Sequence, residues 1–283
     1  MLESVAGFDH LTILVRNIDL AASTYRRLGF QLTERGHHTL GTCNHTIVLE
    51  GSYLELLGIE SPGPGNERHR KLLERGEGPG GIALRTRDAR QVREELRELR
   101  FAVDPSIDAA RPVRVADGSK EARFTITQFP DGVPPGVRMF ACQHRTPDLI
   151  WRPEWQAHEN GAGRVLELLI VHQRPEELTA DYRSLFGTSA VIESGNAMTL
   201  DLAGIAIRFL TPEGIAARYP GQPVSVQTNG YLAGAIVGVR DLDVAASLLL
   251  RNGVVAGRSA QHGVVVPSHL ACGALLEFRA DAA

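Results

Sequence analysis

Two polar side chains stand out because the sequence places them inside apolar segments. His10 lies in FDHLTILV, a β-branched run that leads into an amphipathic helix, and its imidazole could bind a metal or exchange a proton. Glu55 lies in YLELLGI, where its leucine neighbours would pack on the opposite face of a strand. An unpaired carboxylate buried there is costly, so Glu55 requires a partner. A metal would serve, but so would Arg85 or Arg138, and His10 could be a hydrogen-bonded core residue.

The elements that must position these residues are repeated along the chain. VRNIDLAAS, residues 15–23, matches VRDLDVAAS, residues 239–247, at six of nine positions. Each copy follows an apolar strand and continues through a helix to a glycine, and two weaker copies begin at GGIALRT and VLELLIV. The chain therefore contains four repeats of about 71 residues each.

Each repeat is predicted to form one strand, one helix and three further strands, which is an α+β architecture of four βαβββ modules. In the first module, Asn17 is the predicted N-cap of the helix and Gly29 its end. The strands that follow are predicted at residues 30–35, 43–50 and 52–59. The Pro- and Gly-rich segment 60–80 is interpreted as a connector between the first two modules, with at most one helical turn.

Paired βαβββ modules resemble the vicinal oxygen chelate superfamily, and this chain looks like a four-module member of its glyoxalase-like branch. The stretches that carry the resemblance are DHLTILVRNIDLAASTYRRLGF, YLELLGI, GGIALRT, GAIVGVRDLDVAAS and ALLEFRA. HRTPDLIWRPEWQAHENGA is in addition similar to a signature of one glyoxalase-like subfamily. The resemblance implies two glyoxalase/dihydroxybiphenyl-dioxygenase-like domains, at residues 1–150 and 164–283, with a linker at residues 151–163.

The resemblance also implies a divalent metal in the cup of a module pair, with ligands from the first and last strands of each module. His10 stands at the first-strand position and Glu55 at the last-strand position, where it could also act as a general base. Gly81 stands where similar proteins have a second histidine. We therefore expect His144, at the end of VRMFACQH, to be the replacement ligand.

Two further residues could point into the same cup: His45 on a neighbouring strand, and Gln143 beside His144. His37 and His38 are expected to be solvated. The C-terminal half has Glu167, Arg208, Gly234 and Glu277 at the corresponding ligand positions. An arginine cannot ligate a cation and would repel one, so we expect the N-terminal cup to be the functional one and the second domain to be degenerate.

The amino-acid composition limits the classes of partner that the chain is expected to bind. The net charge of −3, from 30 basic and 33 acidic residues, does not favour nucleic acid or an anionic membrane. The three cysteines Cys43, Cys142 and Cys272 lack CxxC spacing, and no apolar run is long enough to span a membrane. We expect a cytoplasmic protein that binds a small-molecule substrate; a homodimer is compatible with the sequence.

The resemblance implies a metal-dependent lyase, isomerase or dioxygenase acting on a small oxygen-rich metabolite that chelates the metal through two oxygens. The donor set does not choose among Fe, Mn, Ni and Zn. The alternative is a non-catalytic protein that binds or sequesters a small molecule, as resistance proteins of this fold do. Gly81 and the ligand-poor C-terminal half favour that alternative.

Overall fold

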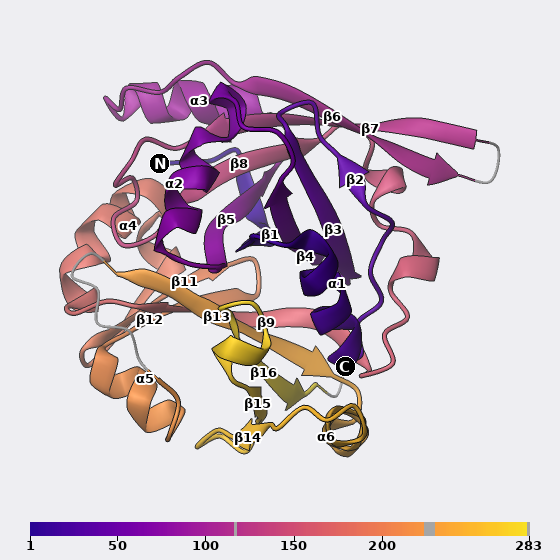
Figure 1. The fold of residues 1–283 in the computed structure, drawn as a ribbon. Helices are drawn as coiled ribbons and strands as arrows, with labels where there is room; N and C mark the ends of the chain where they lie inside the picture. The colour runs from indigo at the N-terminus through magenta and orange to yellow at the C-terminus, as the bar shows by residue number, and fades with distance from the viewer. Residues whose placement is uncertain (116–117, 224–229, 282–283) are drawn as a thin grey trace.

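The computed structural model describes residues 1–115, 118–223 and 230–281. Two eight-stranded sheets make up the molecule, one from each half of the chain. In Figure 1 the first sheet, coloured indigo to magenta, lies above the second, coloured pink to yellow. The α+β class and the four βαβββ modules predicted from the repeats are confirmed.

The first sheet contains the first two modules, which meet where β1 pairs with β5. Its strands, in sheet order, are β2 (Gly36–His37), β3 (Thr42–Leu49), β4 (Ser52–Ile59), β1 (Val5–Val15), β5 (Gly78–Thr86), β8 (Met139–His144), β7 (Gly118–Gln128) and β6 (Ile107–Val115). The two ends of this sheet approach each other, because the Thr39 N–H donates to the carbonyl oxygen of Ala110 at 3.2 Å. The sheet therefore curls around an interior.

The second sheet repeats this order with the third and fourth modules. Its strands are β10 (Val191–Ser194), β11 (Ala197–Leu202), β12 (Ile205–Leu210), β9 (Ala162–Val171), β13 (Tyr231–Val239), β16 (Leu275–Ala280), β15 (Val264–Val266) and β14 (Gly257–Arg258). As in the first sheet, the two modules meet through an antiparallel pair, here β9 and β13. The pattern of pairing is thus the same in both halves of the chain.

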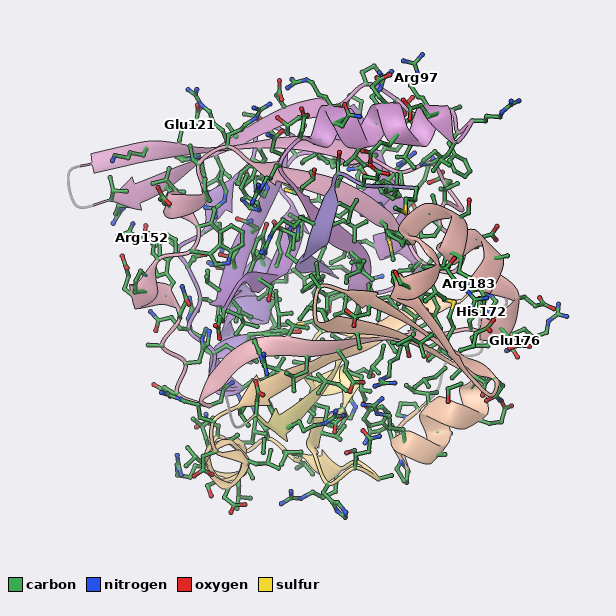
Figure 2. The ribbon with its side chains drawn as sticks, turned by 180° about the vertical axis from the view of Figure 1, so that it is seen from behind. Arg97, Glu121, Arg152, His172, Glu176 and Arg183 are labelled. Carbon is green, nitrogen blue, oxygen red and sulfur yellow. The ribbon has the colours of Figure 1, made fainter. Side chains whose placement is uncertain are left out.

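One large apolar core joins the two halves. Alternate residues of β1 and β9, including Leu11, Ile13, Leu168 and Ile170, belong to it. The helix of each module packs on the same core: α1 (Ile18–Arg27), α3 (Ala89–Glu98), α4 (Thr179–Phe186) and α6 (Leu242–Arg251). Charged side chains such as Arg97 on α3 and Glu121 on β7 lie at the periphery, as Figure 2 shows. The opposite face of each sheet is therefore left to line a separate interior.

Local predictions for the first module hold with two exceptions. The Asn17 side chain accepts from the backbone N–H groups of Asp19 and Leu20 and caps α1, as expected. Residues 30–35, predicted as a strand, have no strand pairing; only Gly36 and His37 pair with β3. The connector at 60–80 contains a nine-residue helix, α2 (Glu67–Arg75), which is longer than the single turn expected.

A further helix, α5 (Pro212–Arg218), follows β12 and packs Ile215 against the interior of the second sheet. Among the described residues, no helix combines the length and the apolar character that a membrane span requires.

Candidate functional site

A cavity of about 290 Å³ lies inside the first sheet. Side chains from β1, β3, β4, β6, β7 and β8 line it, and α2 with the turn before it covers one side. Its wall combines apolar rings, including Tyr53, Phe124 and Phe140, with the polar side chains of His10 and Glu55. The structure therefore places the two residues that opened the sequence argument on one buried surface.

His10 and Glu55 come from the neighbouring parallel strands β1 and β4. His10 Nε2 lies 3.6 Å from Glu55 Oε2, and the two residues are 3% and 7% exposed. The Glu55 carboxylate also accepts from Asn44 Nδ2 at 2.7 Å and from the Thr12 hydroxyl at 3.4 Å. Burial by itself would raise the pKa of Glu55, but its electrostatic interactions with His10 and His38 and the Asn44 hydrogen bond lower it below its ordinary value. Glu55 is therefore ionised at neutral pH.

Asp9 is part of the same site, although it was not among the site residues predicted from the sequence. The pairing of β1 with β5 shifts register between Phe8 and His10, so Asp9 is the extra residue of a bulge. The bulge lets both Asp9 and His10 turn to the inner face, and Asp9 Oδ1 lies 2.7 Å from His10 Nδ1. An imidazole that donates from Nδ1 to a carboxylate is fixed in orientation and presents Nε2 to the cavity.

His144 contacts Asp9 as well, with its Nε2 2.9 Å from the same oxygen, Oδ1. Burial would raise the pKa of Asp9, but the charges and hydrogen bonds of His144 and His10 lower it well below its ordinary value of 3.8. Arg85 Nε lies 3.4 Å from the other Asp9 oxygen. Trp151 covers this end of the site, with its ring 4.8 Å from that of His144.

Asp9, His10, Cys142 and His144 form a group whose donor atoms all lie within 4.8 Å of one another, and such a group could hold a metal ion. Two imidazoles, a thiol and a carboxylate are a donor set typical of zinc. In the structure, however, both imidazoles bond to one carboxylate oxygen. Burial also raises the pKa of the Cys142 thiol, so a metal bound there would have to displace the thiol proton.

The predicted ligand set of His10, Glu55 and His144 does not surround one point. His10 contacts Glu55 through Nε2 but faces Asp9, the partner of His144, through Nδ1. His144 therefore lies on the far side of the His10 ring from Glu55. The assignment of these three residues as metal ligands stays a prediction from the sequence.

The second module supplies no replacement ligand at the equivalent positions. In the first module His10 pairs with Tyr53, which precedes Glu55 by two residues. In the second module Ile82 pairs with Met139, so Gly81 is in register with Arg138, which precedes Phe140 by two residues. Position 81, equivalent to His10, is a glycine, and the equivalent of Glu55 is Phe140. A Cβ added at Gly81 would lie 2.6 Å from Arg138 Nη1. The second half of a metal centre is thus replaced by a guanidinium and an aromatic ring, and the residues present do not fit the predicted three-ligand centre.

Two arginines face this cavity without a carboxylate partner. Arg111, on β6, is 4% exposed and makes no hydrogen bond or ion pair with any described residue. Arg138 donates to Gln128 Oε1 at 2.7 Å and lies over the Phe140 ring, but its Nε and Nη1 have no partner in the described parts of the chain. Burial lowers the pKa of Arg111 and brings that of Arg138 down to about 10, so both remain cations at neutral pH.

His38 and His69 complete the polar wall. His38 Nδ1 lies 2.9 Å from the Thr42 hydroxyl, and His69 Nδ1 is buried without a hydrogen-bond partner in the described residues. Burial lowers the pKa of each to about 4, so both are neutral at physiological pH. His38 was expected to be solvated; it is partly exposed and lines the cavity, whereas His37 is exposed and pairs with Glu60.

The structure does not bring His45 and Gln143 into the cavity. His45 lies on the opposite face of β3, where its Nδ1 is 2.8 Å from the carbonyl oxygen of Thr33. Gln143 likewise faces away from the cavity and bonds to the backbone of Arg87 and Ala89, at the start of α3. Both residues hold backbone segments in place.

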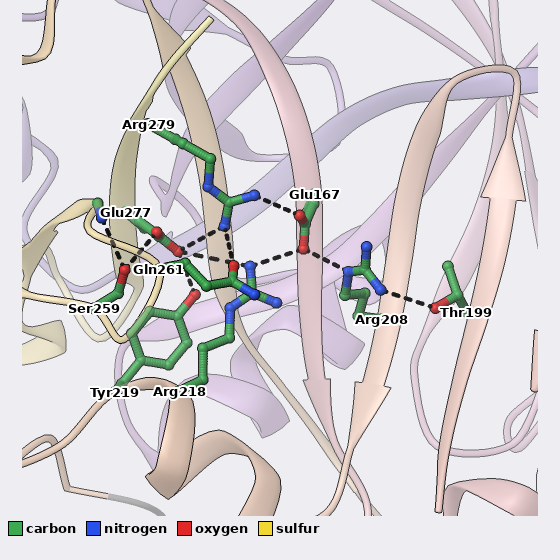
Figure 3. A network of polar contacts seen from close by, with 10 residues as sticks. Glu167, Thr199, Arg208, Arg218, Tyr219, Ser259, Gln261, Glu277 and Arg279 are labelled. Atoms are coloured by element: carbon green, nitrogen blue, oxygen red, sulfur yellow. Dashed lines mark hydrogen bonds and ion pairs between the residues drawn. The ribbon is translucent and has the colours of Figure 1, made fainter. Parts of the chain in front are cut away.

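The corresponding interior of the second sheet is filled by an ion-pair network, shown in Figure 3. Glu167 accepts from Arg208, Arg218 and Arg279 at 2.7, 2.9 and 2.7 Å. Glu277 accepts from Ser259 and Tyr219 and lies 3.2 Å from Arg279. Every carboxylate at the predicted ligand positions is therefore occupied by cations or hydroxyls of the chain itself, which accords with a degenerate second cup.

Comparisons with known proteins agree with this fold. A family model described as a glyoxalase-like domain matches residues 8–186, which is more than half of the chain and includes the whole N-terminal cavity. This match confirms the resemblance found in the repeated modules. A comparison with curated proteins gave no match.

Three solved structures share the architecture. A hypothetical protein from Staphylococcus aureus has a TM-score of 0.70 at 13% identity, covering 97% of this chain and 99% of that one. A mutant of 4-hydroxymandelate synthase from Streptomyces coelicolor has a TM-score of 0.55 at 13% identity, covering 90% and 77%. A xylose isomerase-like TIM barrel/4-hydroxyphenylpyruvate dioxygenase fusion protein has a TM-score of 0.60 at 14% identity, covering 100% and 50%. At these identities the likeness concerns the fold alone.

Proposed function

The chain belongs to the glyoxalase-like domain family, and on that premise we propose that it is an enzyme that moves a proton on a small oxygen-rich metabolite. Glu55 is the general base, and the reaction takes place in the cavity of the first sheet. The observation that carries the proposal is a buried, ionised carboxylate on the wall of a cavity, 3.6 Å from an imidazole nitrogen. The cavity is at the lower end of the usual size range of ligand sites, so the substrate is small.

The chemistry is abstraction of a proton from a carbon next to a carbonyl or carboxylate group. The C–H bond breaks, an O–H bond forms on Glu55, and the electron pair moves onto the carbonyl oxygen as an enolate. Return of the proton to the same or a neighbouring atom completes an epimerisation or isomerisation without any oxidant. An anionic substrate near Glu55 would raise the pKa of this carboxyl group and make it a stronger base.

His10 and Asp9 support the base. Nε2 of His10 is placed to take the proton on from Glu55, and Asp9 would then stabilise the imidazolium through Nδ1. This proton relay from Glu55 to His10, supported by Asp9, is shielded from water, since all three side chains are buried. Dioxygenase chemistry is less well supported, because it needs a facial triad of two histidines and a carboxylate. The second module offers only Gly81, Phe140 and Arg138 in that place.

The divalent metal expected from the sequence, whether Fe, Mn, Ni or Zn, is not required by this proposal. A non-catalytic binding protein is the second candidate, because half of the ligand positions of the cup are replaced. The two candidates differ in one property: only the enzyme exchanges a carbon-bound proton with solvent.

The test is solvent exchange in D₂O with a panel of small 2-oxo and 2-hydroxy carboxylates, followed by proton NMR. We expect the wild-type protein to exchange the C–H proton of at least one member, and Glu55→Gln to slow this exchange by at least about 100-fold. Glu67→Gln is the matched control, because Glu67 also lines the cavity but pairs with Lys71 near the surface. Wild-type protein that binds a panel member without exchange would support the binding protein, and equal rates in wild type and Glu55→Gln would exclude Glu55 as the base.

A further inference from the structure

Arg111 is the least compensated charge in the cavity. Its guanidinium is carried inward by β6, on which Ala109, Arg111 and Val113 alternate with exposed residues. An unpaired charge at 4% exposure is destabilising, because the ion has lost its water without gaining a partner. Nothing in the fold of β6 requires an arginine there, since the side chain makes no hydrogen bond with the described residues.

The surroundings of Arg111 leave a place for an anion. Glu55 also lines the cavity and accepts hydrogen bonds from Asn44 and Thr12, but it makes no ion pair with Arg111. Arg111 and Glu55 both line the cavity, so the two groups face the same space, and no hydrogen bond or ion pair joins them. A small molecule can therefore lie between the cation and the base.

We propose that Arg111 binds an oxyanion group of the substrate, a carboxylate or a phosphate, and that the substrate is consequently an anionic metabolite. This inference deepens the proposed function and rests on it for the identity of the reacting carbon. The planar guanidinium presents two parallel N–H groups, which match the two oxygens of a carboxylate or phosphate. With the anion held there, the carbon next to it faces the carboxylate of Glu55, which is the geometry that proton abstraction needs.

The experiment is isothermal titration of wild-type and variant protein with pyruvate, 2-oxobutyrate, the uncharged pyruvamide and inorganic phosphate. The wild-type protein should bind at least one of the anions and bind pyruvamide more weakly than pyruvate. Arg111→Met should weaken anion binding by about 10- to 100-fold. Arg114→Met, on the exposed side of the same strand, should leave binding unchanged. The stronger of the pyruvate and phosphate signals identifies which oxyanion the site takes.

A second readout separates a binding role from a structural one. Because Arg111 is buried without a partner among the described residues, Arg111→Met should raise the melting temperature while it weakens anion binding. A lower melting temperature or failure to fold would show that Arg111 is structural and would overturn the inference. Unchanged anion affinity in Arg111→Met, or no anion binding by the wild-type protein, would overturn it as well.

The inference and the proposed function fail separately. Glu55→Gln should bind the anions at least as tightly as wild type, since it removes a negative charge from the cavity, but should lose proton exchange. Anion binding that depends on Arg111 in a protein without exchange would leave the inference standing and remove the proposed reaction. Proton exchange that survives in Arg111→Met would leave the proposed reaction standing and remove the inference about Arg111.

Discussion

Arg138 occupies the space that a side chain at position 81 would need: its Nη1 lies 2.6 Å from where a Cβ on Gly81 would be. Gly81 in the second module is equivalent to His10 in the first module. The N-terminal cup therefore keeps the polar pair of one module, His10 and Glu55, and has Gly81 and Phe140 in place of the pair of the other. A guanidinium on that side disfavours a cation by charge as well as by the missing ligands.

This relationship predicts the effect of restoring the ligands. The triple variant Gly81→His, Phe140→Glu and Arg138→Ala should bind about one equivalent of Zn²⁺, because it completes a set of four donors with His10 and Glu55. The double variant without Arg138→Ala is the control and should bind less, since the guanidinium remains. Metal analysis after dialysis gives the stoichiometry.

Metal removal from the wild-type protein is predicted to leave proton exchange unchanged. The measurement is the exchange rate before and after dialysis against a chelator, with the metal content determined on the same samples. Loss of exchange on dialysis and its return with Fe, Mn, Ni or Zn would show that the site, despite Gly81 and Arg138, works through a metal. The ligand prediction of His10, Glu55 and His144 would then be the one to test by substitution.

Stability should fall as the pH is lowered from neutral, in part through His69. Its pKa is about 4 in the folded protein against an ordinary value of 6.5, so the unfolded chain binds a proton first. The stability that neutral His69 contributes is complete above pH 6.5 and is lost as the pH falls toward about 4. His69→Gln should therefore flatten the decline of the melting temperature across this window. The exposed His269→Gln is the control and should leave the slope as in wild type.

The network of the second sheet should be structural. Glu167 is 7% exposed and joins three arginines, so Glu167→Gln leaves the buried Arg218 and the partly exposed Arg208 and Arg279 with one carboxylate fewer. We expect a loss of about 2–3 kcal/mol in the free energy of unfolding, measured with urea. Glu193→Gln breaks an exposed ion pair with Arg183 and should cost less than about 1 kcal/mol. An equal effect of both variants would mean that the network contributes no more than surface charges do.

The repeated pattern was sufficient to predict the modules and the positions of His10 and Glu55. Helix caps such as Asn17 and the alternation of apolar residues are local signals, and local signals survive in the fold. The arginine at position 208 led to the prediction that the second cup is degenerate, because a cation cannot replace a metal ligand; in the structure it donates to Glu167.

The rest of the site depends on contacts between distant segments. Asp9 joins the site only because a bulge turns two consecutive residues to one face, and the sequence does not signal that bulge. Arg111 lines the cavity of Glu55 because the sheet curls until β6 faces β3 and β4. His69 lines it because the connector folds into α2. An arginine among apolar residues on β6 was the one available signal for Arg111. His45 was one of two further residues considered for the cup, but the inner face of β3 carries Asn44 and Thr46 and His45 lies on the other face.

The most direct test of the account is a crystal structure of the protein with the carboxylate whose proton exchanges fastest. We predict the carboxylate group on the Arg111 guanidinium and the exchanging carbon within van der Waals contact of a Glu55 oxygen. A ligand bound with its carboxylate elsewhere, or with that carbon turned away from Glu55, would contradict the assignment of Glu55 as the base in this cavity.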